Sequence, residues 1–458
     1  MRMKIDVNTF AIEDYLGKEF ECDCQRTHTT RLETVSVQDH VDTVIIQYCK
    51  DHGYHTLYMI EDENTKEAYG QALEQTLINA GFEVDTVCLE KDVVPNEIAV
   101  FNIVLNLKRK YDYILGVGSG TLNDLSKFIS HKLQLDYGIV ATAPSMDGFA
   151  SVGAALITDD LKTTYDCHVP TAIFGDLDVL CQAPIDMIKA GLGDIVGKYN
   201  CLVDWKMSHI INDEYYCQTI VDMVYKSIKE VVDHADGVLN RDKAAIKAIT
   251  EALIETGMAM GFVGNSRPAS GSEHHVSHYW EMKFLFAHHA PVFHGAKVGL
   301  ATPGIIALWK MLGQEELDFE KCKEKVAQFD QEQWKKLVCD RFEGASQGVL
   351  DLEEKAGKNN IENALQRIDH IQKQWPLIQE VIEKELPDPV KVVEILKSVE
   401  APYCPSHVDI SDEMVKDSLI LAKEVRVRYG LLQLLWDLGL LEEYSDRFVE
   451  FYRGIDAC

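Results

Sequence analysis

The sequence between Thr34 and Leu180 alternates short runs rich in β-branched residues with amphipathic stretches of helical spacing. Four of the runs are strand candidates, namely HTLYMIED, GFEVDTVCL, YDYILGVG and YGIVATAP. Between the first two, TKEAYGQALEQTLINAG has apolar residues three and four positions apart and ends at Gly81, a usual helix stop. This alternation predicts βαβ units and a parallel sheet.

A different pattern marks where this α/β part should end. The segment SVGAALITDDLKTTYDCHVPTAIFGDL has TDDLK between two apolar stretches, which predicts a β-hairpin at the sheet edge. From Pro184 onward the spacing is helical, for example in VDMVYKSIKEVVDHADGVL, KAAIKAITEALIETGMAMGF and EVRVRYGLLQLLWDLGLL. We therefore expect an α/β domain over residues 1–183, with an aperiodic N-terminal extension (1–33), and an all-α helical bundle over 184–458.

Charge and apolar content argue against binding to nucleic acid or membranes. The chain has 45 Lys and Arg against 74 Asp and Glu, a net charge of −29, which disfavours binding to nucleic acid and anionic lipid. No apolar run resembles a signal peptide or approaches the roughly 18 residues of a membrane span. The 12 cysteines have neither zinc-ribbon nor CxxC spacing, which indicates reduced thiols. We expect a cytoplasmic protein that does not insert into a membrane.

A glycine-rich turn, GVGSGTLND (residues 116–124), follows the strand candidate YDYILGVG and leads into a helical stretch. Glycines at 116, 118 and 120 let the backbone approach a ligand, and the first helical N–H groups can bind a pyrophosphate at the positive end of the helix dipole. The context fits a dinucleotide site. Tight turns also need glycine for backbone reasons alone, so both interpretations stay open.

An acidic strand end lies before the glycines rather than after them. In the usual fingerprint the acid that contacts the cofactor ribose follows the glycines by about 20 residues. Here Glu61 and Asp62 end the run HTLYMIED, and Asp62 is our candidate for the ribose contact. Its charge would repel a 2′-phosphate and favours NAD over NADP. Asp62 also suits a helix N-cap, and both roles can hold together.

Two histidine clusters indicate a metal site. They are GSEHHVSHYWEM, with His274, His275 and His278, and AHHAPVFHGAKVG, with His288, His289 and His294. In a helix His274 and His278 share a face. A catalytic metal usually has three protein ligands and one open position, and Asp194 in the glycine-rich GLGDIVGKY supplies the missing carboxylate at the domain junction. Nitrogen and oxygen ligands suit zinc, iron(II) or nickel; exposed or capping histidines are the alternative.

Five motifs occur in a characteristic order: GVGSGTLND, TAPSMDGFAS, GLGDIVGKY, NSRPASGSEHHVSHYWEM and HGAKVGL. With them the chain resembles the sn-glycerol-1-phosphate dehydrogenase family of the iron-containing alcohol dehydrogenase superfamily, from roughly Val37 to Leu440. NSRPASGSEH followed by SH is the specific part. The resemblance implies a dehydroquinate synthase-like fold, NAD or NADP, one divalent metal ion, and interconversion of glycerol 1-phosphate and dihydroxyacetone phosphate in phospholipid metabolism.

The resemblance also implies site residues. Cofactor contacts fall on Gly118, Ser119, Gly120, Thr121, Leu122, Thr142, Ser145 and Ser151. Metal ligation falls on Asp194, His274 and His294. Asp147, Asp194 and His278 surround the substrate, with Asp194 and His278 as catalytic residues. The additional pair His288 and His289 could compete for the metal; His294 is preferred because HGAKVGL matches the family element, and His289 is the fallback.

A phosphorylated substrate needs a local cation in a chain of this charge. Arg267, just before the helix that carries His274, is our candidate for the phosphate, and a surface arginine stacked beside Pro268 is the alternative. Two other activities stay open, a polyol dehydrogenase acting on glycerol and a dehydroquinate synthase-like cyclase. A non-catalytic metal-binding protein is a third possibility. We also expect a homodimer.

Overall fold

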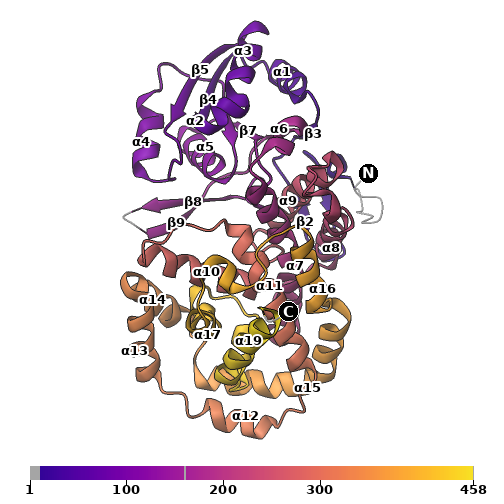
Figure 1. The fold of residues 1–458 in the computed structure, drawn as a ribbon, viewed down its shortest axis with the longest axis vertical. Helices are drawn as coiled ribbons and strands as arrows, with labels where there is room; N and C mark the ends of the chain where they lie inside the picture. The colour runs from indigo at the N-terminus through magenta and orange to yellow at the C-terminus, as the bar shows by residue number, and fades with distance from the viewer. Residues whose placement is uncertain (1–10, 159–160, 457–458) are drawn as a thin grey trace. The chain divides into compact units, whose positions relative to one another are not determined.

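The computed structural model describes residues 11–158 and 161–456 (Figure 1). By its internal contacts the chain divides into two compact units, Met1–Ile195 with Gln218–Asn265 and Val196–Cys217 with Ser266–Cys458. The division differs from the predicted boundary at residue 184. Helices α8 (Gln218–Asp233) and α9 (Lys243–Val263) belong to the first unit because α9 packs on strands and helices of the α/β part. Helix α7 (Ile185–Asn212) runs unbroken through the boundary.

The first unit contains a six-stranded sheet in the order β3-β10-β7-β6-β4-β5, and every pairing is parallel. Its strands are β3 (Thr34–Gln38), β4 (Thr56–Asp62), β5 (Glu83–Leu89), β6 (Tyr113–Gly118), β7 (Tyr137–Ala141) and β10 (Ala172–Asp176). The four predicted strands are confirmed as β4 to β7. Strand β10 lies inside the segment that we interpreted as a hairpin, and its sequence, AIFGD, has only a short apolar run that carries too little periodicity to stand out.

Helices cover both faces of this sheet (Figure 1). On one face, Leu57 and Met59 of β4 pack against α1 (Val41–Asp51) and α3 (Gln71–Asn79). On the other, Tyr58 and Ile60 pack against α4 (Glu97–Leu105) and α5 (Gly120–Leu133). Successive β4 side chains thus enter opposite cores, as expected of a strand buried on both faces. The α/β prediction for this part is confirmed.

Two small hairpins accompany the sheet. The predicted one forms from β8 (Gly153–Thr158) and β9 (Leu161–Asp166), which pair antiparallel in a separate sheet; β3 and β5 occupy the edges of the main sheet. The N-terminal extension, for which no element was predicted, contains the short helix η2 (Ile12–Asp14) and a hairpin of β1 (Glu19–Glu21) and β2 (Thr27–Thr29). Residues 1–10 of the extension lie outside the described residues.

From residue 177 to residue 456 the described elements are all helices, which confirms the helical prediction for the second half of the chain. The longer helices of the second unit are α10 (Ser272–Phe286), α11 (His294–Gly313), α12 (Phe319–Val326), α13 (Gln331–Phe342), α14 (Ser346–Ala356), α15 (Ile361–Glu385), α16 (Pro389–Ser398), α17 (Asp412–Leu421) and α19 (Leu441–Asp456). Within the described ranges, we find no helix with the length and apolarity to cross a membrane.

One predicted helix is interrupted. The stretch EVRVRYGLLQLLWDLGLL was expected to be continuous, but η7 (Ala422–Val425) ends before Arg426, and α18 (Leu431–Asp437) begins only after Gly430. Arg426 and Gly430 both have extended backbones. Two β-branched residues and a glycine in this short segment lower its helix propensity, which accounts for the break.

Buried Glu61, at the end of β4, should make stability depend on pH. Neither of its carboxylate oxygens has a hydrogen-bond partner among the described residues, and burial raises its pKa to about 7. Ionising Glu61 therefore costs free energy in the folded state. This destabilisation is absent below about pH 4.5, grows as the pH rises, and reaches its full size above about pH 7. Glu61→Gln should raise the free energy of unfolding by up to about 3 kcal/mol at pH 8, and much less at pH 5.

Urea denaturation at the two pH values measures this difference. Exposed Glu63, two residues along, gives the matched control in Glu63→Gln, which should not alter the pH profile. Equal effects of Glu61→Gln at both pH values would show that the folded protein tolerates the Glu61 carboxylate.

Candidate active site

The carboxyl ends of three neighbouring strands carry the residues predicted to bind a dinucleotide. Asp62 ends β4, Gly118 ends β6, and the loop with Thr142 and Ser145 follows β7. The Thr142 N–H donates to the Gly118 carbonyl at 3.1 Å, and the hydroxyls of Ser119 and Ser145 lie 2.6 Å apart. The loop after β7 is thereby joined to the glycine turn, at the sheet edge where parallel α/β folds bind ligands.

The glycine turn is required for close packing of α5 on β6. A Cβ at Gly118 would lie 2.3 Å from Leu122 Cδ1, and one at Gly116 would lie 2.5 Å from Ser126 Oγ. Ser119 is the N-cap residue of α5, but its hydroxyl donates to the Ala143 carbonyl and makes no capping hydrogen bond. The first amides of this 14-residue helix therefore receive no cap from Ser119, a suitable arrangement for an anionic ligand.

Asp62 has the N-cap role that we considered as its alternative. Its carboxylate accepts from the Thr65 N–H at 2.8 Å, while the Thr65 hydroxyl accepts from the Asp62 N–H at 3.0 Å. This reciprocal pair begins α2 (Glu63–Thr65), which leads into a π-helical turn, η3 (Lys66–Gly70). Because the cap uses one carboxylate oxygen, a ribose contact by the other stays a prediction.

Ser151 lies beside a buried lysine that the sequence analysis missed. Lys127, on α5, donates to Ser151 Oγ at 3.1 Å and to the carbonyls of Gly148 and Gly153 at 3.0 and 2.8 Å. Burial lowers the pKa of Lys127. The lysine thus holds the segment from Gly148 to Gly153 against the helix that begins at the glycine turn.

The predicted metal ligands lie together. One ligand atom each from Asp194, His274 and His294 falls within 4.8 Å of the others. Asp194 is on α7, His274 is in the first turn of α10, and His294 begins α11. Asp194 and His274 are buried, whereas His294 is half-buried. A buried carboxylate and two imidazoles with one partly open side match the donor set of a catalytic divalent metal.

Neighbouring groups orient two of these ligands. Glu273, which is fully buried, accepts from His274 Nδ1 at 2.6 Å and from the Gly271 N–H at 2.9 Å. Nδ1 therefore carries the proton, and Nε2 of His274 is left with its lone pair for a metal. The Asp147 N–H donates to Asp194 Oδ2 at 3.1 Å, which ties the predicted substrate loop to the metal carboxylate. The residues fit the ion that the family resemblance implies.

A second group shares a ligand with the first. His278, Glu281 and His294 also offer atoms within 4.8 Å of one another, and His278 Nδ1 lies 3.4 Å from Glu281 Oε2. The His278 and His294 ring centroids are 5.5 Å apart. Since His294 belongs to both groups, we treat them as one centre with His278 at its side. Glu281 was missed, although its position three residues after His278 was visible in the sequence.

The competing histidines lie elsewhere. His288 and His289 are exposed, and the His289 ring stacks on Phe284 with the centroids 5.7 Å apart. Neither belongs to a candidate ligand group among the described residues, nor does buried His275. The geometry therefore favours His294 over the fallback His289.

Arg267 is buried and already occupied. Its Nε donates to Glu214 Oε1 at 2.8 Å, its Nη1 donates to the Tyr429 carbonyl at 2.7 Å, and its Nη2 pairs with Glu214 Oε2. With 3% of its surface exposed it is not the surface arginine that we considered as an alternative. The carboxylate of Glu214 neutralises its charge, which weakens the case for a phosphate contact by Arg267.

Comparison with known proteins gives two kinds of match. Residues 37–184 match a family described as iron-containing alcohol dehydrogenase. A glycerol-1-phosphate dehydrogenase [NAD(P)+] of Halalkalibacterium halodurans is 37% identical over 65% of this chain and 76% of its own length. The corresponding protein of Geobacillus stearothermophilus is 31% identical over 94% of this chain and 99% of its own length.

Solved structures confirm the fold. A glycerol dehydrogenase from Schizosaccharomyces pombe superposes with a TM-score of 0.59 at 16% identity, and 94% of each chain is covered. A maleylacetate reductase from a Rhizobium species gives 0.57 at 11% identity, with 91% of this chain and 97% of that chain covered. At these identities the likeness concerns the fold alone.

Proposed function

Because the chain belongs to the glycerol-1-phosphate dehydrogenase family, within the iron-containing alcohol dehydrogenases, we propose that it interconverts glycerol 1-phosphate and dihydroxyacetone phosphate with NAD or NADP. The observation that carries the proposal is the group of ligand atoms from Asp194, His274 and His294. Asp194 accepts a hydrogen bond from the Asp147 N–H, and Ser145 of the same loop is hydrogen-bonded to Ser119 in the glycine turn. Metal ligands and the predicted cofactor edge are thus connected by one loop.

We assign the chemical roles as follows. Asp194, His274 and His294 would hold a divalent cation, which would supply Lewis-acid stabilisation of negative charge on the alcohol oxygen. Glu273 fixes the tautomer of His274, and Asp147 and His278 position the substrate hydroxyls. His278, with Glu281 behind its Nδ1, is suited to relay the hydroxyl proton.

The cofactor is proposed to lie along the glycine turn. The N-terminus of α5, with residues Gly118 to Leu122, would bind the pyrophosphate, and Thr142, Ser145 and Ser151 would contact the rest of the cofactor. Ser119 and Ser145 are already linked by a hydrogen bond, which supports a preformed site. A ribose contact by Asp62 would favour NAD over NADP.

A cation other than Arg267 is the better candidate for the substrate phosphate. Arg428 donates to Ser266 Oγ and to the Ser270 carbonyl, and burial lowers its pKa to about 10. In the described residues neither Arg428 nor Arg426 forms an ion pair with a carboxylate. Both follow η7, which packs against α10, the helix that carries His274 and His278. We therefore propose that Arg428 and Arg426 bind the phosphate and that Arg267 supports them.

Arg428→Met tests this assignment. The substitution keeps an unbranched side chain and removes the charge, and a charge-assisted hydrogen bond contributes about 1.5–3 kcal/mol, so KM for dihydroxyacetone phosphate should rise roughly 10- to 100-fold. KM for unphosphorylated dihydroxyacetone should not change. Arg341→Met, which removes a partly exposed arginine paired with Glu413 and Asp417, is the control. If only Arg267→Met raised KM for dihydroxyacetone phosphate, Arg267 and not Arg428 would be the residue that binds the phosphate.

The activity itself is tested by mixing the protein with NADH or NADPH and dihydroxyacetone phosphate, dihydroxyacetone or no substrate, before and after metal chelation. We expect oxidation of the cofactor with the phosphorylated ketone, loss on chelation, and an sn-1 product. Equal activity on dihydroxyacetone would indicate a polyol dehydrogenase. No net change in NADH absorbance with any substrate would contradict the dehydrogenase activity and would favour a dehydroquinate synthase-like cyclase.

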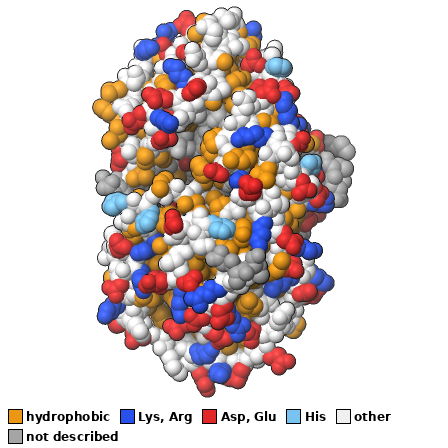
Figure 2. Space-filling view, viewed as in Figure 1, with side chains coloured by type: hydrophobic (Ala, Val, Ile, Leu, Met, Phe, Trp, Pro, Cys, Tyr) orange, Lys and Arg blue, Asp and Glu red, His pale blue; other side chains and the backbone are white. Residues whose placement is uncertain are grey.

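We further propose a homodimer in the cytoplasm. Helix α4 leaves Ile98, Phe101 and Leu105 each at least 60% exposed, and Figure 2 shows hydrophobic atoms at the surface in this region. Exposed apolar groups of this size favour burial against a second copy. Light scattering should give twice the chain mass of 51.7 kDa, and Phe101→Glu should give the single mass. A wild-type monomer would contradict the proposal.

A further inference from the structure

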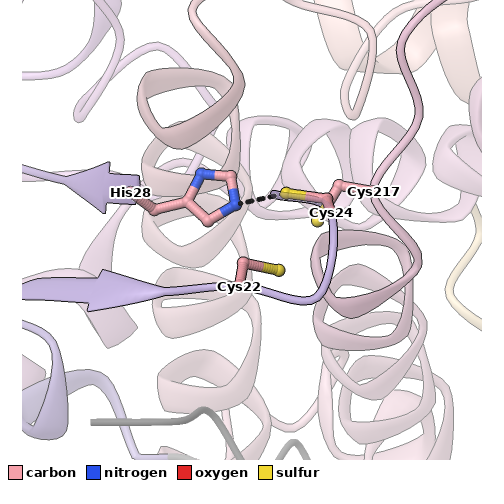
Figure 3. A group of neighbouring side chains, drawn as sticks. All are labelled: Cys22, Cys24, His28 and Cys217. Carbon is pink, nitrogen blue, oxygen red and sulfur yellow. Dashed lines mark hydrogen bonds between the residues drawn. The ribbon is translucent and has the colours of Figure 1, made fainter. Parts of the chain in front are cut away.

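A further group of metal-ligating side chains shares no residue with the candidate active site. Cys22, Cys24, His28 and Cys217 each offer a ligand atom within 4.8 Å of the others. In Figure 3 the three sulfur atoms and the imidazole turn toward one another, and Cys24 Sγ lies 3.3 Å from His28 Nε2. Cys217 and His28 are buried, and Cys22 and Cys24 are half-buried. Four soft or borderline donors thus converge on one point.

The N-terminal hairpin supplies three of the four donors. Cys22 directly follows β1, and the turn to β2 is closed by hydrogen bonds from Gln25 N to Cys22 O at 3.0 Å and from Cys22 N to Arg26 O at 3.2 Å. Gln25 has a left-handed backbone, with φ of 66°. This tight turn brings Cys24 back over the hairpin, where His28 faces it from β2.

The fourth donor lies immediately before helix α8. Cys217 immediately precedes Gln218, the first residue of α8, and Cys22 Sγ lies 3.4 Å from the hydroxyl of Thr219 in the same first turn. The hairpin tip therefore sits at the beginning of α8. Cys217 lies about 190 residues after Cys24 in the sequence. No local spacing therefore links it to Cys22 and Cys24.

The His28 ring is set in the tautomer that a metal requires. Its Nδ1 lies 2.8 Å from the Phe262 carbonyl, which only accepts, so Nδ1 carries the proton and Nε2 has the lone pair. The ring packs against Phe20 and Phe262, with centroids 5.1 and 5.9 Å away. Carbonyl-oriented imidazoles of this kind are the usual histidine ligands of zinc.

We propose that Cys22, Cys24, His28 and Cys217 bind a structural zinc ion. Structural zinc is tetrahedral, with Zn–S of about 2.3 Å and Zn–N of about 2.0 Å, so its sulfur and nitrogen ligands lie about 3.5 Å apart. The 3.3 Å between Cys24 Sγ and His28 Nε2 is close to that edge. Three thiolates and one imidazole complete the coordination, which leaves no position for substrate.

The zinc site would hold the β1–β2 hairpin against helices α8 and α9. Phe262, which orients His28, lies near the end of α9, and Gly257 of the same helix packs directly against Asp147 and Ala150. In this proposal the metal stabilises the packing of the hairpin on α8 and α9 and takes no part in catalysis.

Metal analysis of the full-length protein, purified without chelator from zinc-containing medium, tests the proposal. His294→Ala, which lacks a catalytic ligand, should retain about one equivalent of zinc per chain, and adding Cys24→Ser should remove it. Adding Cys181→Ser instead, at another half-buried cysteine outside the group, should leave the zinc in place.

A second measurement needs no variant in the cluster. After exchange into cobalt(II), the wild-type protein should show a near-ultraviolet thiolate-to-cobalt band, which Asp194, His274 and His294 cannot produce. Absence of this band, zinc that persists when Cys24→Ser is combined with His294→Ala, or a disulfide among the three cysteines in the purified protein would each overturn the proposal.

Discussion

Asp194→Asn should remove the metal equivalent bound at the active site, while the zinc proposed at Cys24 and its partners stays, and should lower kcat for reduction of dihydroxyacetone phosphate by about a thousand-fold or more. The amide has nearly the same size as the carboxylate, but it lacks the charge that binds a divalent ion between two neutral imidazoles. A Lewis acid contributes several kcal/mol to catalysis, and about 4 kcal/mol corresponds to a thousand-fold change in rate. Titration with zinc or nickel, followed by single-turnover rates, measures both effects.

Two further variants set the scale for this result. Asp186→Asn changes an exposed carboxylate on the same helix α7 and should leave metal content and kcat unchanged. Glu273→Gln removes the carboxylate that orients His274, and loss of such a partner typically costs about 10- to 100-fold in metal affinity. Its kcat at saturating metal should be largely retained. If Asp194→Asn kept full metal occupancy and wild-type kcat, Asp194 would not be a ligand of the catalytic metal.

The parts of the fold that the sequence could predict are those with long, regular periodicity. Strands β4 to β7 and helices α8 and α9 each carry a pattern over several residues, and all were expected. Strands β3 and β10 were not among the expected strands, and they are identified as strands by pairing, β3 with β10 and β10 also with β7. Sheet order is a tertiary property, which local periodicity does not encode.

The candidate site divides along similar lines. His274, His278 and Asp194 stand in dense motifs, so residue type and spacing were enough to select them. The ion pair of Arg267 with Glu214 was not foreseeable, because its partner lies 53 residues away. The group of Cys22, Cys24, His28 and Cys217 escaped notice for the same reason, and its C-x-C spacing led us to expect plain thiols. Such contacts are fixed only when the chain packs.

The loop after β7 that contains Pro144 and Asp147 packs its backbone against two glycines. A Cβ at Gly191 of α7 would lie 2.0 Å from the Pro144 carbonyl oxygen. A Cβ at Gly257 of α9 would lie 2.9 Å from the Asp147 carbonyl oxygen. Both contacts involve backbone atoms, which cannot rotate away as a flexible side chain can. Any added methyl group must therefore displace the loop whose Asp147 N–H holds the carboxylate of Asp194.

Gly257→Ala should consequently destabilise the protein by about 1–3 kcal/mol and lower kcat/KM at least roughly ten-fold, with Gly191→Ala more severe in both. Gly261 lies one turn further along α9, and a Cβ there would have nothing within 4 Å, so Gly261→Ala should be neutral or stabilising by up to about 1 kcal/mol. Urea denaturation and steady-state kinetics compare the three. Equal stability and kcat/KM for Gly257→Ala and Gly261→Ala would mean that the loop shifts freely, and that its contact with Asp194 does not position the metal carboxylate.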